Sequence, residues 1–397
     1  MGKSIVSLFI VLTFGFGFTL TSMAEDGVTD KEIHIGQWGP LTGPAASWGS
    51  VLRGTDVLFK MINDEGGIHG RKIVYHMFDD SYSPVKTLAG VKQLQESVGI
   101  FAWAGGVGTS TGLAVKDYIM SKKVPWVGPV SGSIHWIMPP QKYLFAVYPL
   151  YYMEARVLAR YALEKMGKKR FAMIYQNDDY GTYGLDGAEI EIKNHGLKLL
   201  AKIPVETSDT DLRPSIVKLK KVNPEVVLIW LNPTQAINVV RNSNIENFKP
   251  QWMTTSTCSD FEYMYKLSKS HWEGVFSVLF SELPNSNLPL MQKYRNAYEK
   301  YGSKEDRWGP FFYAGIGLLE PMIEALKRCG RDLTREKFIK EMEGIKNFKG
   351  ISGNISYKPF DPEDPECRQG QKEVFVIQCQ KNGQTKVLSD WMEIKIK

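Results

Sequence analysis

The stretch GIFAWAGGVGTSTG, residues 99–112, places a short apolar run directly before a loop rich in glycine and hydroxyl side chains. Residues 99–104 are predicted to form a buried strand, because the run is short, continuously apolar and bounded by glycines. A helix is expected from about Ser110 to Lys122. A strand, a loop and a helix in this order form the repeating unit of parallel α/β sheets, so the stretch predicts that class of fold.

The same alternation recurs on both sides of this stretch. The first half is predicted to hold strands at 32–38, 71–78, 99–104 and 124–128, and helices at about 50–63, 84–97 and 110–122. The second half is predicted to hold strands at 170–176, 198–204, 226–231 and 251–255, and helices at about 183–195, 211–221 and 233–241. One further strand to Phe280, helices at about 288–301, 310–328 and 334–342, and a C-terminal hairpin turning at 382–383 complete the prediction. The sequence therefore predicts two α/β halves, each with a parallel sheet covered on both faces.

The first 24 residues have the pattern of a secretory signal peptide. A positive start at Lys3 precedes an apolar run from Ile5 to Leu20, and small residues stand at Ser22 and Ala24. Cleavage is expected after Ala24, which predicts a periplasmic, secreted chain. The alternative is a membrane anchor, but the apolar run is shorter than the about 20 residues that a spanning helix needs.

Composition and charge narrow the classes of function. The 397 residues suit two domains of ordinary size. The net charge of +6 is spread along the chain without a basic run, so nucleic acid is not an expected partner. The six histidines are scattered, with no pair three or four residues apart, so neither a metal site nor another cofactor is expected.

Four cysteines could form disulfides in an exported protein. They are Cys258, Cys329, Cys367 and Cys379, and they allow three full pairings. The pair Cys367–Cys379 is favoured, because these two residues flank a predicted turn and strand near the C-terminus.

Hydroxyl side chains and glycines follow two neighbouring predicted strands of the first half. Ligands of parallel sheets bind beyond the carboxyl ends of the strands, where helices begin. Thr109 and Ser110 lie there after the strand at 99–104, and Ser131 and Gly132 lie there after the strand at 124–128. Hydroxyls and free N–H groups at a helix N-terminus suit a carboxylate or another anion. The alternatives are an ordinary helix cap and an ordinary turn.

One of these loops also reads Gly-x-Ser-x-Gly across residues 108–112, which is the pattern of an esterase nucleophile at Ser110. A catalytic triad would need an acid and then a histidine downstream, for which His195 or His271 could formally serve. Against this, no His-Gly-Gly-type segment precedes the loop, and a second complete α/β half is foreign to that fold. A binding protein is therefore favoured over a secreted serine hydrolase.

Other candidate residues follow strands of the second half or lie in the first loop. Tyr180, Asn232 and Ser256 follow the strands at 170–176, 226–231 and 251–255, and Trp48 lies in the loop after the first strand. Aromatic residues at such rims commonly close over a ligand, whereas the alternative for each of them is core packing.

Several short motifs together resemble the binding proteins of the branched-chain amino acid (Leu/Ile/Val) ABC transport family. The resemblance covers nearly the whole chain after the leader. The motifs are GVTDKEIHIG at 27–36, PLTGP at 40–44 followed by Trp48-Gly49, NDEGGIHG at 63–70, Asp79-Asp80 and Tyr180-Gly181.

The resemblance implies a type I periplasmic binding protein fold, in which two Rossmann-like lobes are joined by a three-strand hinge and close on a ligand. It implies one lobe of residues 26–148 plus 281–350 and another of 149–280 plus 351–397. It also implies a small-molecule ligand, an ABC permease in the inner membrane as partner, and a monomer. A ligand-sensing module of a receptor is the alternative that shares this fold.

Carried over by matching position, the family's ligand carboxylate lies against Thr109 and Ser110 and against Ser131 and Gly132. Trp48 and Trp308 hold places of pocket aromatics, and Tyr180 matches the tyrosine of the second lobe.

The sequence departs from the family at two positions. Ser256 stands where an acid often pairs with the ligand ammonium, and Asn232 stands where an aromatic residue is common. A buried ammonium without an acid is costly, although Asp260 could substitute. We therefore expect an aromatic or aliphatic organic acid flanked by Trp48, Trp308 and Trp103. A branched-chain or other apolar amino acid, and an amide or urea, are the alternatives.

Overall fold

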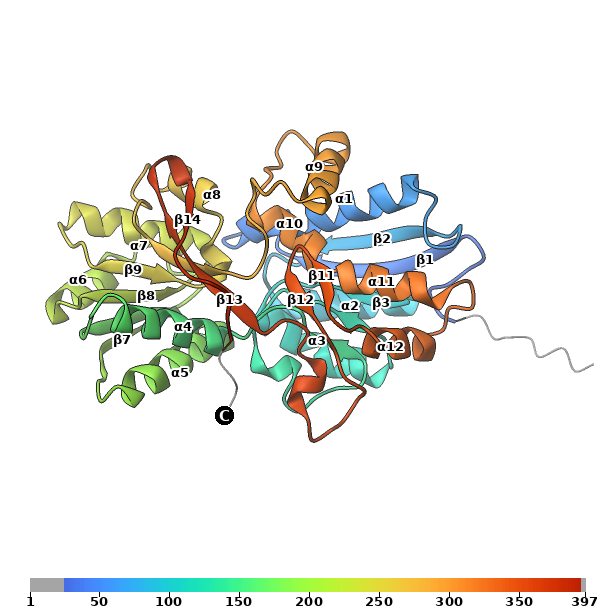
Figure 1. The fold of residues 1–397 in the computed structure, drawn as a ribbon, viewed down its shortest axis with the longest axis horizontal. Coiled ribbons are helices and arrows are strands. Elements are labelled where there is room, and N and C mark those ends of the chain that lie inside the picture. The colour runs from blue at the N-terminus through green and yellow to red at the C-terminus, as the bar shows by residue number, and fades with distance from the viewer. Residues whose placement is uncertain (1–24, 394–397) are drawn as a thin grey trace, which may run out of the picture.

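The computed structural model describes residues 25–393, and the predicted signal peptide with its cleavage site after Ala24 lies outside these residues. The chain forms two lobes side by side (Figure 1). The first lobe holds a five-stranded parallel sheet in the order β2-β1-β3-β4-β5. Its strands are β1 (Glu32–Gly39), β2 (Lys72–Asp79), β3 (Ala102–Ala104), β4 (Trp126–Val127) and β5 (Leu144–Phe145).

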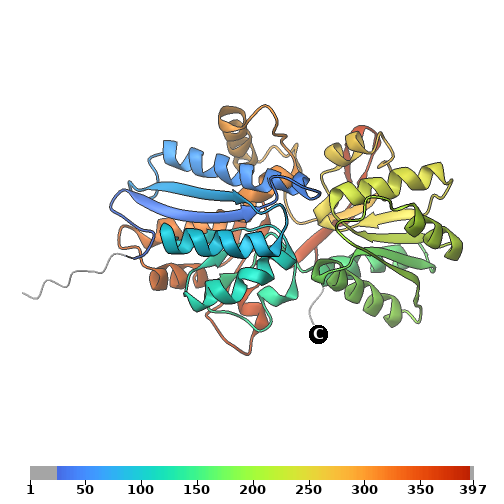
Figure 2. The same cartoon turned by 180° about the vertical axis from the view of Figure 1, so that it is seen from behind.

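Helices cover both faces of this first sheet. Seen from behind, α2 and α3 lie on the near face (Figure 2), and the later helices α11 and α12 lie on the opposite face (Figure 1). The helices of this lobe are α1 (Ser50–Asp64), α2 (Pro84–Ser97), α3 (Thr109–Ser121), α9 (Pro289–Tyr301), α10 (Pro310–Gly317), α11 (Glu320–Cys329) and α12 (Arg335–Glu343).

The second lobe holds an eight-stranded sheet with β14-β13-β10-β9-β8-β6-β7 in order, to which β15 adds beside β13. The strands β6 to β10 are parallel to one another. β13 pairs antiparallel with β10, and β14 and β15 each pair antiparallel with β13. The strands are β6 (Phe171–Gln176), β7 (Leu199–Val205), β8 (Val226–Trp230), β9 (Gln251–Thr254), β10 (Phe276–Leu279), β13 (Glu373–Cys379), β14 (Thr385–Val387) and β15 (Met392–Glu393). The helices are α4 (Tyr151–Glu164), α5 (Asp179–Asn194), α6 (Arg213–Val222), α7 (Pro233–Ile245) and α8 (Phe261–Leu267).

The buried centre of the second sheet follows from its sequence. All five residues of β8, Val226 to Trp230, are fully buried. A strand buried on both faces must be apolar at every position, as the run VVLIW is. Two Rossmann-like lobes with parallel strands confirm the predicted fold class, and no helix within residues 25–393 is long and apolar enough to cross a membrane.

The chain passes between the lobes three times. It leaves the first lobe between β5 and α4, and it returns after β10 toward α9. It then crosses back into β13, the red strand that runs between the lobes in Figure 1. These three connecting segments form the hinge of the type I fold.

Residues 351–371 lie with the first lobe, although the predicted division placed them in the second. The backbone N–H of Ala146 donates to Arg368 O at 2.9 Å, and Gly370 N–H donates to Ala146 O at 2.8 Å. Tyr357 adds a hydrogen bond from its phenol to Ala146 O at 3.1 Å. The segment therefore extends the β5 edge of the first sheet, just after the small hairpin of β11 (Phe348–Gly350) and β12 (Gly353–Ile355).

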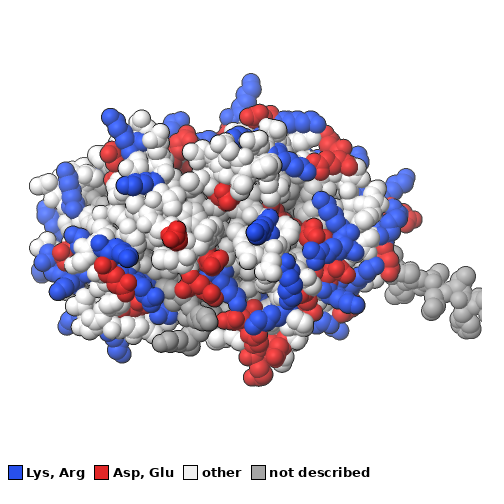
Figure 3. Space-filling model, viewed as in Figure 1, with Lys and Arg blue, Asp and Glu red and all other residues white. Residues whose placement is uncertain are grey.

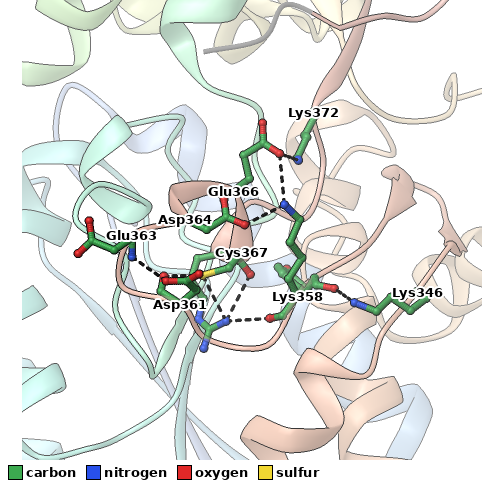
Figure 4. Close-up of polar contacts among 10 residues, drawn as sticks. Lys346, Lys358, Asp361, Glu363, Asp364, Glu366, Cys367 and Lys372 are labelled. Carbon is green, nitrogen blue, oxygen red and sulfur yellow. Dashed lines mark hydrogen bonds and ion pairs between the residues drawn. The ribbon is translucent and has the colours of Figure 1, made fainter. Parts of the chain in front are cut away.

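The predicted Cys367–Cys379 disulfide is not formed. All four cysteines are free, and all four are buried. Cys367 lies in a short 3-10 helix beside the first lobe, within a group of ion pairs that includes Lys358–Asp364 at 2.8 Å (Figure 4). Cys379 ends β13 in the second lobe. The extended strand, at about 3.3 Å per residue, holds the two sulfur atoms apart.

Helix α8, of only seven residues, is not predicted, and three other helical regions differ from the prediction for identifiable reasons. Helix α4 is not predicted, because residues on nearly all its sides are buried and no amphipathic stripe marks it. Helix α5 begins at Asp179 rather than Tyr183, since the side chain of Asp178 caps it. The predicted helix 310–328 is divided after Gly317, and Pro321, which lacks an N–H, stands in the first turn of α11.

Candidate functional site

A cavity lies between the two lobes at the carboxyl ends of the parallel strands. Residues of both lobes line it. The first lobe contributes loops that follow its strands, including Trp48, Tyr82 and Gly108. The second lobe contributes Tyr180 after β6 and Ser256 after β9. This is the position at which parallel sheets bind ligands.

The walls of this cavity are aromatic and carry hydroxyl groups. The rings of Tyr148 and Phe280 pack in a tilted arrangement with centroids 4.5 Å apart, and Trp48 meets Tyr180 edge-on at 6.1 Å. Among the lining residues, all within 25–393, there is no Asp, Glu, Lys, Arg or His. The aromatic lining residues are Trp48, Tyr82, Tyr148, Tyr151, Tyr180, Phe280 and Phe311. An apolar body with few polar groups fits such walls.

The structure brings three of the predicted site residues together on this wall, namely Trp48, Tyr180 and Ser256. The indole N–H of Trp48 donates across the cleft to Thr257 O at 3.1 Å. The phenol of Tyr180 donates to Leu231 O at 3.2 Å and lies 2.7 Å from the Thr257 hydroxyl. The two aromatic side chains are therefore fixed by hydrogen bonds as well as by packing.

The predicted anion loops lie at the first-lobe end of the cavity. Gly108 lines the cavity and precedes α3, and it supplies no side-chain cap to the first turn of that helix. Thr109 Oγ1 lies 2.7 Å from Ser131 Oγ, which joins the two predicted loops. Ser110 is half-buried in the same turn. These hydroxyls stand behind Gly108 rather than in the wall itself.

Gly132 is required by close packing between the second of these loops and the hinge. A Cβ atom at this position would lie 2.2 Å from Pro149 O, which no side chain tolerates. The carbonyl of Gly132 accepts a hydrogen bond from Tyr151 N–H at 2.8 Å. The residue therefore positions the loop against the first crossing.

Two other predicted side chains lie outside the cavity wall. Asn232 is buried and caps α7, where its Oδ1 accepts from Gln235 N–H at 3.0 Å. Asn232 was predicted to line the pocket, but its side-chain carbonyl is used to cap α7. Trp103 is fully buried within β3 and donates its N–H to Gln95 Oε1 at 3.1 Å, so it belongs to the core.

Trp308 lines a neighbouring cavity instead of the central one. Its indole N–H donates to Pro284 O at 2.9 Å, and its ring packs on Tyr313 at 5.3 Å. Asp260, the predicted substitute acid, lines the same neighbouring cavity and caps α8. Burial raises the pKa of Asp260 to about 6, against the lowering effect of Arg307. Neither residue faces the central cavity.

The acid that does stand behind the cavity is Glu154, which the sequence analysis did not identify. It is fully buried in the first turn of α4. Its carboxylate accepts from Thr255 Oγ1 at 2.5 Å, from Ser256 Oγ at 2.6 Å and from Ser256 N–H at 3.1 Å. Burial raises the pKa of Glu154 to about 7, although these hydrogen bonds oppose the shift. In the sequence it is one of four charged residues of α4, with Arg156, Arg160 and Glu164, and no local pattern distinguishes it from them.

The rims of the two lobes are in contact, so the cleft is closed. Ser47 Oγ lies 2.7 Å from the Tyr263 phenol, and Thr234 Oγ1 donates to Pro44 O at 3.0 Å. On the far rim, the Tyr183 phenol lies 2.6 Å from His135 Nε2. Each pair joins residues of different lobes.

The alternative triad at Ser110 is not assembled. His195 ends α5 in the second lobe, where its Nδ1 lies 2.9 Å from Glu191 O. His271 follows α8 in the same lobe. The loop carrying Ser110 belongs to the first lobe.

A closed two-lobed clamp with an aromatic cavity at the carboxyl ends of both parallel sheets is the architecture of a solute-binding protein. The family model described as a periplasmic binding protein matches residues 32–384, and the chain belongs to this family.

The comparisons with individual proteins agree with this family. Leu/Ile/Val-binding protein homolog 1 of Brucella suis is 22% identical over 349 residues, which are 86% of this chain and 91% of that protein. Homolog 3 of Brucella melitensis is 29% identical over 197 residues, 49% of this chain and only 53% of that protein. A fatty acid ABC transporter substrate-binding protein from Thermomonospora curvata superposes with a TM-score of 0.79 at 21% identity, covering 94% and 95% of the two chains.

Proposed function

We propose that this chain is the extracytoplasmic binding component of an ABC importer, and that it captures a small carboxylate-bearing ligand by closing its lobes. The observation that carries the proposal is the interlobe cavity, whose walls are aromatic and hydroxyl-bearing and include no charged side chain. The leader supports a periplasmic location, and the importer role is supported by the relatives. A monomer and a permease partner belong to the same proposal.

The chemistry of the walls favours an organic acid over an amino acid. A buried ammonium needs an acid in contact with it. No acid lines the cavity among the described residues, and Glu154 behind the wall already accepts three hydrogen bonds. Aromatic walls suit an aromatic or aliphatic body. The fatty acid named for one structural neighbour has this chemistry, whereas the Leu/Ile/Val-binding relatives support the amino-acid alternative.

The N-terminus of α3 is the proposed seat of the ligand carboxylate. Free N–H groups and the helix dipole favour an anion there, and no side chain caps the first turn. The hydroxyls of Thr109, Ser110 and Ser131, which stand behind Gly108, and the backbone at Gly132 would orient the loop that receives the carboxylate.

The proposed lobes follow the predicted division with one amendment. Residues 26–148 and 281–350 form the first lobe, and the second begins at 149. The hydrogen bonds of Ala146 with Arg368 and Gly370 favour a third crossing near residue 371, rather than at 351.

Calorimetric titration of the mature protein, unfolded and refolded to remove carried-over ligand, tests the proposal. Benzoate, phenylacetate and octanoate are compared with leucine, isoleucine and valine. We expect carboxylates without an amine to bind, and Trp48→Ala to weaken binding at least tenfold. Trp391→Ala, which alters a Trp on the surface that contacts Phe375, is the matched control and should bind normally. Binding of the amino acids alone would refute the organic-acid proposal, and binding of neither class would refute the ligand class altogether.

Uptake experiments separate an importer component from a receptor module. If the chain serves an importer, cells lacking it should lose uptake of the bound carboxylate, and cells lacking the permease should lose it equally. Normal uptake with a lost transcriptional or motile response would favour the receptor alternative.

A further inference from the structure

We infer that Glu154 selects the ligand through the hydroxyls of Ser256 and Tyr148, and that an anionic ligand binds together with one proton carried by Glu154. The inference rests on the proposed function, because it needs a carboxylate in the interlobe cavity. It goes further in naming the residue that sets the polarity of the second-lobe wall.

A continuous chain of hydrogen bonds connects the buried acid to the cavity. Ser256 Oγ lies 2.6 Å from Glu154 Oε1 and 2.5 Å from the phenol oxygen of Tyr148. Both Ser256 and Tyr148 line the cavity, whereas Glu154 lies behind them. Tyr148 belongs to the first crossing and Ser256 to the second lobe, so the chain spans the hinge.

The charge of Glu154 determines which atom donates in each hydrogen bond between Glu154, Ser256 and Tyr148. An ionised carboxylate only accepts, so Ser256 must donate its single hydroxyl proton to Glu154. Ser256 Oγ then accepts from Tyr148, whose phenol proton is used. The Tyr148 oxygen offers only a lone pair to the cavity, which suits a donor on the ligand and repels a carboxylate oxygen.

A protonated Glu154 reverses the chain. The acid donates to Ser256 Oγ, and Ser256 donates its own proton to the Tyr148 oxygen. The phenol proton of Tyr148 is then free for an acceptor in the cavity, such as a carboxylate oxygen. One proton at the buried acid therefore converts the wall from an acceptor into a donor.

The surroundings of Glu154 make this proton available near neutral pH. Burial raises the pKa of Glu154 to about 7, and no Lys, Arg or His contributes to that shift among the described residues. The neighbouring phenols and the nearby thiol of Cys258 have raised pKa values and stay neutral. Several other titratable groups face this region. Tyr151 and Cys258 lie near Tyr148, and Asp178 and Tyr180 at the start of α5 lie near Tyr151. Further along α4 and α5 is the Arg156–Glu191 ion pair. Of the strands packed on α4, β10 carries no titratable side chain and β13 carries only Glu373 and Cys379.

The expected pH dependence follows from the sign of this linkage. An anion in the cavity favours neutral Glu154, so the pKa in the complex is higher than the value of about 7 without ligand. Affinity for a carboxylate should be constant below that value. Above it, affinity should fall about tenfold per pH unit until the pKa of the complex is reached.

Titration of the full mature protein with benzoate, phenylacetate and octanoate, in buffers of different ionisation enthalpy, measures the proton directly. We expect uptake near zero at pH 6 that rises toward one proton at pH 8. Binding without proton uptake at pH 8 would refute the inference while leaving the proposed function intact. Binding of leucine alone with proton release would also refute it. If neither the carboxylates nor leucine binds, the proposed function fails and the inference fails with it.

Glu154→Gln separates this role from a structural one, because a Gln amide donates to Ser256 at every pH. The variant should bind the carboxylate at pH 8 about as tightly as the unsubstituted protein does at pH 6, with a flat pH profile. Glu320→Gln is the matched control, since Glu320 is equally buried but bonds to Tyr294 inside the first lobe, and the pH slope should persist. A persistent slope in Glu154→Gln would overturn the inference. If that variant fails to fold, the proton-uptake measurement on the unsubstituted protein decides alone.

Discussion

Two buried glutamic acids, one in each lobe, have nearly the same local chemistry and opposite consequences. Glu154 lies in the first turn of α4, and Glu320 begins α11. Glu320 accepts from the Tyr294 phenol at 2.9 Å and from Ile351 N–H at 2.8 Å, and burial raises the pKa of each acid to about 7. The hydroxyl chain from Glu320 ends in the core at Tyr294, whereas that from Glu154 ends at a ligand cavity. The comparison teaches that the position at which a buried acid's hydrogen bonds end determines whether the acid serves stability or binding.

Truncation of either acid tests the shared half of this comparison. Glu154→Ala and Glu320→Ala each leave buried hydroxyl and N–H donors without an acceptor. We expect each to lower the free energy of unfolding by about 3 kcal/mol, measured by urea denaturation at pH 6. Losses well below 1 kcal/mol would mean that water replaces the carboxylate. Glu324→Ala, at a half-buried residue on the same helix as Glu320, is the control and should change little.

The pH dependence of stability tests whether both acids are neutral in the folded protein. A folded pKa of about 7, raised from 4.5, gives stability that is present below pH 4.5 and lost as pH rises to 7. Each acid should contribute a decrease of about 3 kcal/mol across that window. Glu154→Gln and Glu320→Gln should each remove part of the decrease in urea denaturation curves. An unchanged curve in either variant would show that its acid titrates normally.

Removal of one phenol oxygen tests whether the hydrogen bonds of Glu154, but not those of Glu320, extend to the ligand. Tyr148→Phe keeps the ring but removes the group between Ser256 and the ligand, so carboxylate affinity should fall about tenfold at pH 6, as measured by calorimetry. Tyr294→Phe removes the equivalent phenol beside Glu320 and should leave affinity unchanged. It should cost about 1 kcal/mol of stability. Equal effects of the two variants on binding would break the distinction.

The smallest expected effect concerns the cysteines. Cys367 lies beside the first lobe and Cys379 in the second, so a disulfide between them would tie the lobes and obscure every measurement above. All four thiols are free and buried. We expect dithiothreitol to leave the unfolding midpoint unchanged and thiol reagents to label four cysteines only after unfolding. Fewer than four labelled thiols in the unfolded protein would reveal a disulfide.

The sequence predicted the alternation of strands and helices because apolar runs such as Val226–Trp230 and loops such as 105–112 are local features. It also predicted which loops approach the cavity, since parallel strands end at one edge of a sheet. Trp48, Tyr180 and Ser256 were predicted on this ground and line the cavity, and their contact with a ligand stays a prediction.

The remaining parts of the site depend on long-range packing that a local pattern does not show. Glu154 comes close to Ser256, about one hundred residues further along the chain, only because α4 packs beside β10 and β13 of the second sheet. Asn232 resembled a pocket residue but acts as a helix cap, and the sequence pattern of the two roles is the same. Trp308 lines the neighbouring cavity instead of the central one, and the spacing of residues in the sequence cannot distinguish these two positions.

The charged surface adds little to this comparison, because basic and acidic side chains are interspersed on the face shown in Figure 3. The features compared above, the two buried acids and their hydrogen-bond partners, lie inside the lobes and not on this surface.

The pairing of β13 with β10 also bears on how the chain is made. Strand β10 ends at Leu279, and its antiparallel partner spans residues 373–379. A ribosome that works from the N-terminus therefore leaves this edge of the second sheet bare until β13 has been synthesised. All five strands of the first sheet are present in the growing chain well before that point, so the first sheet can form while the second is still incomplete.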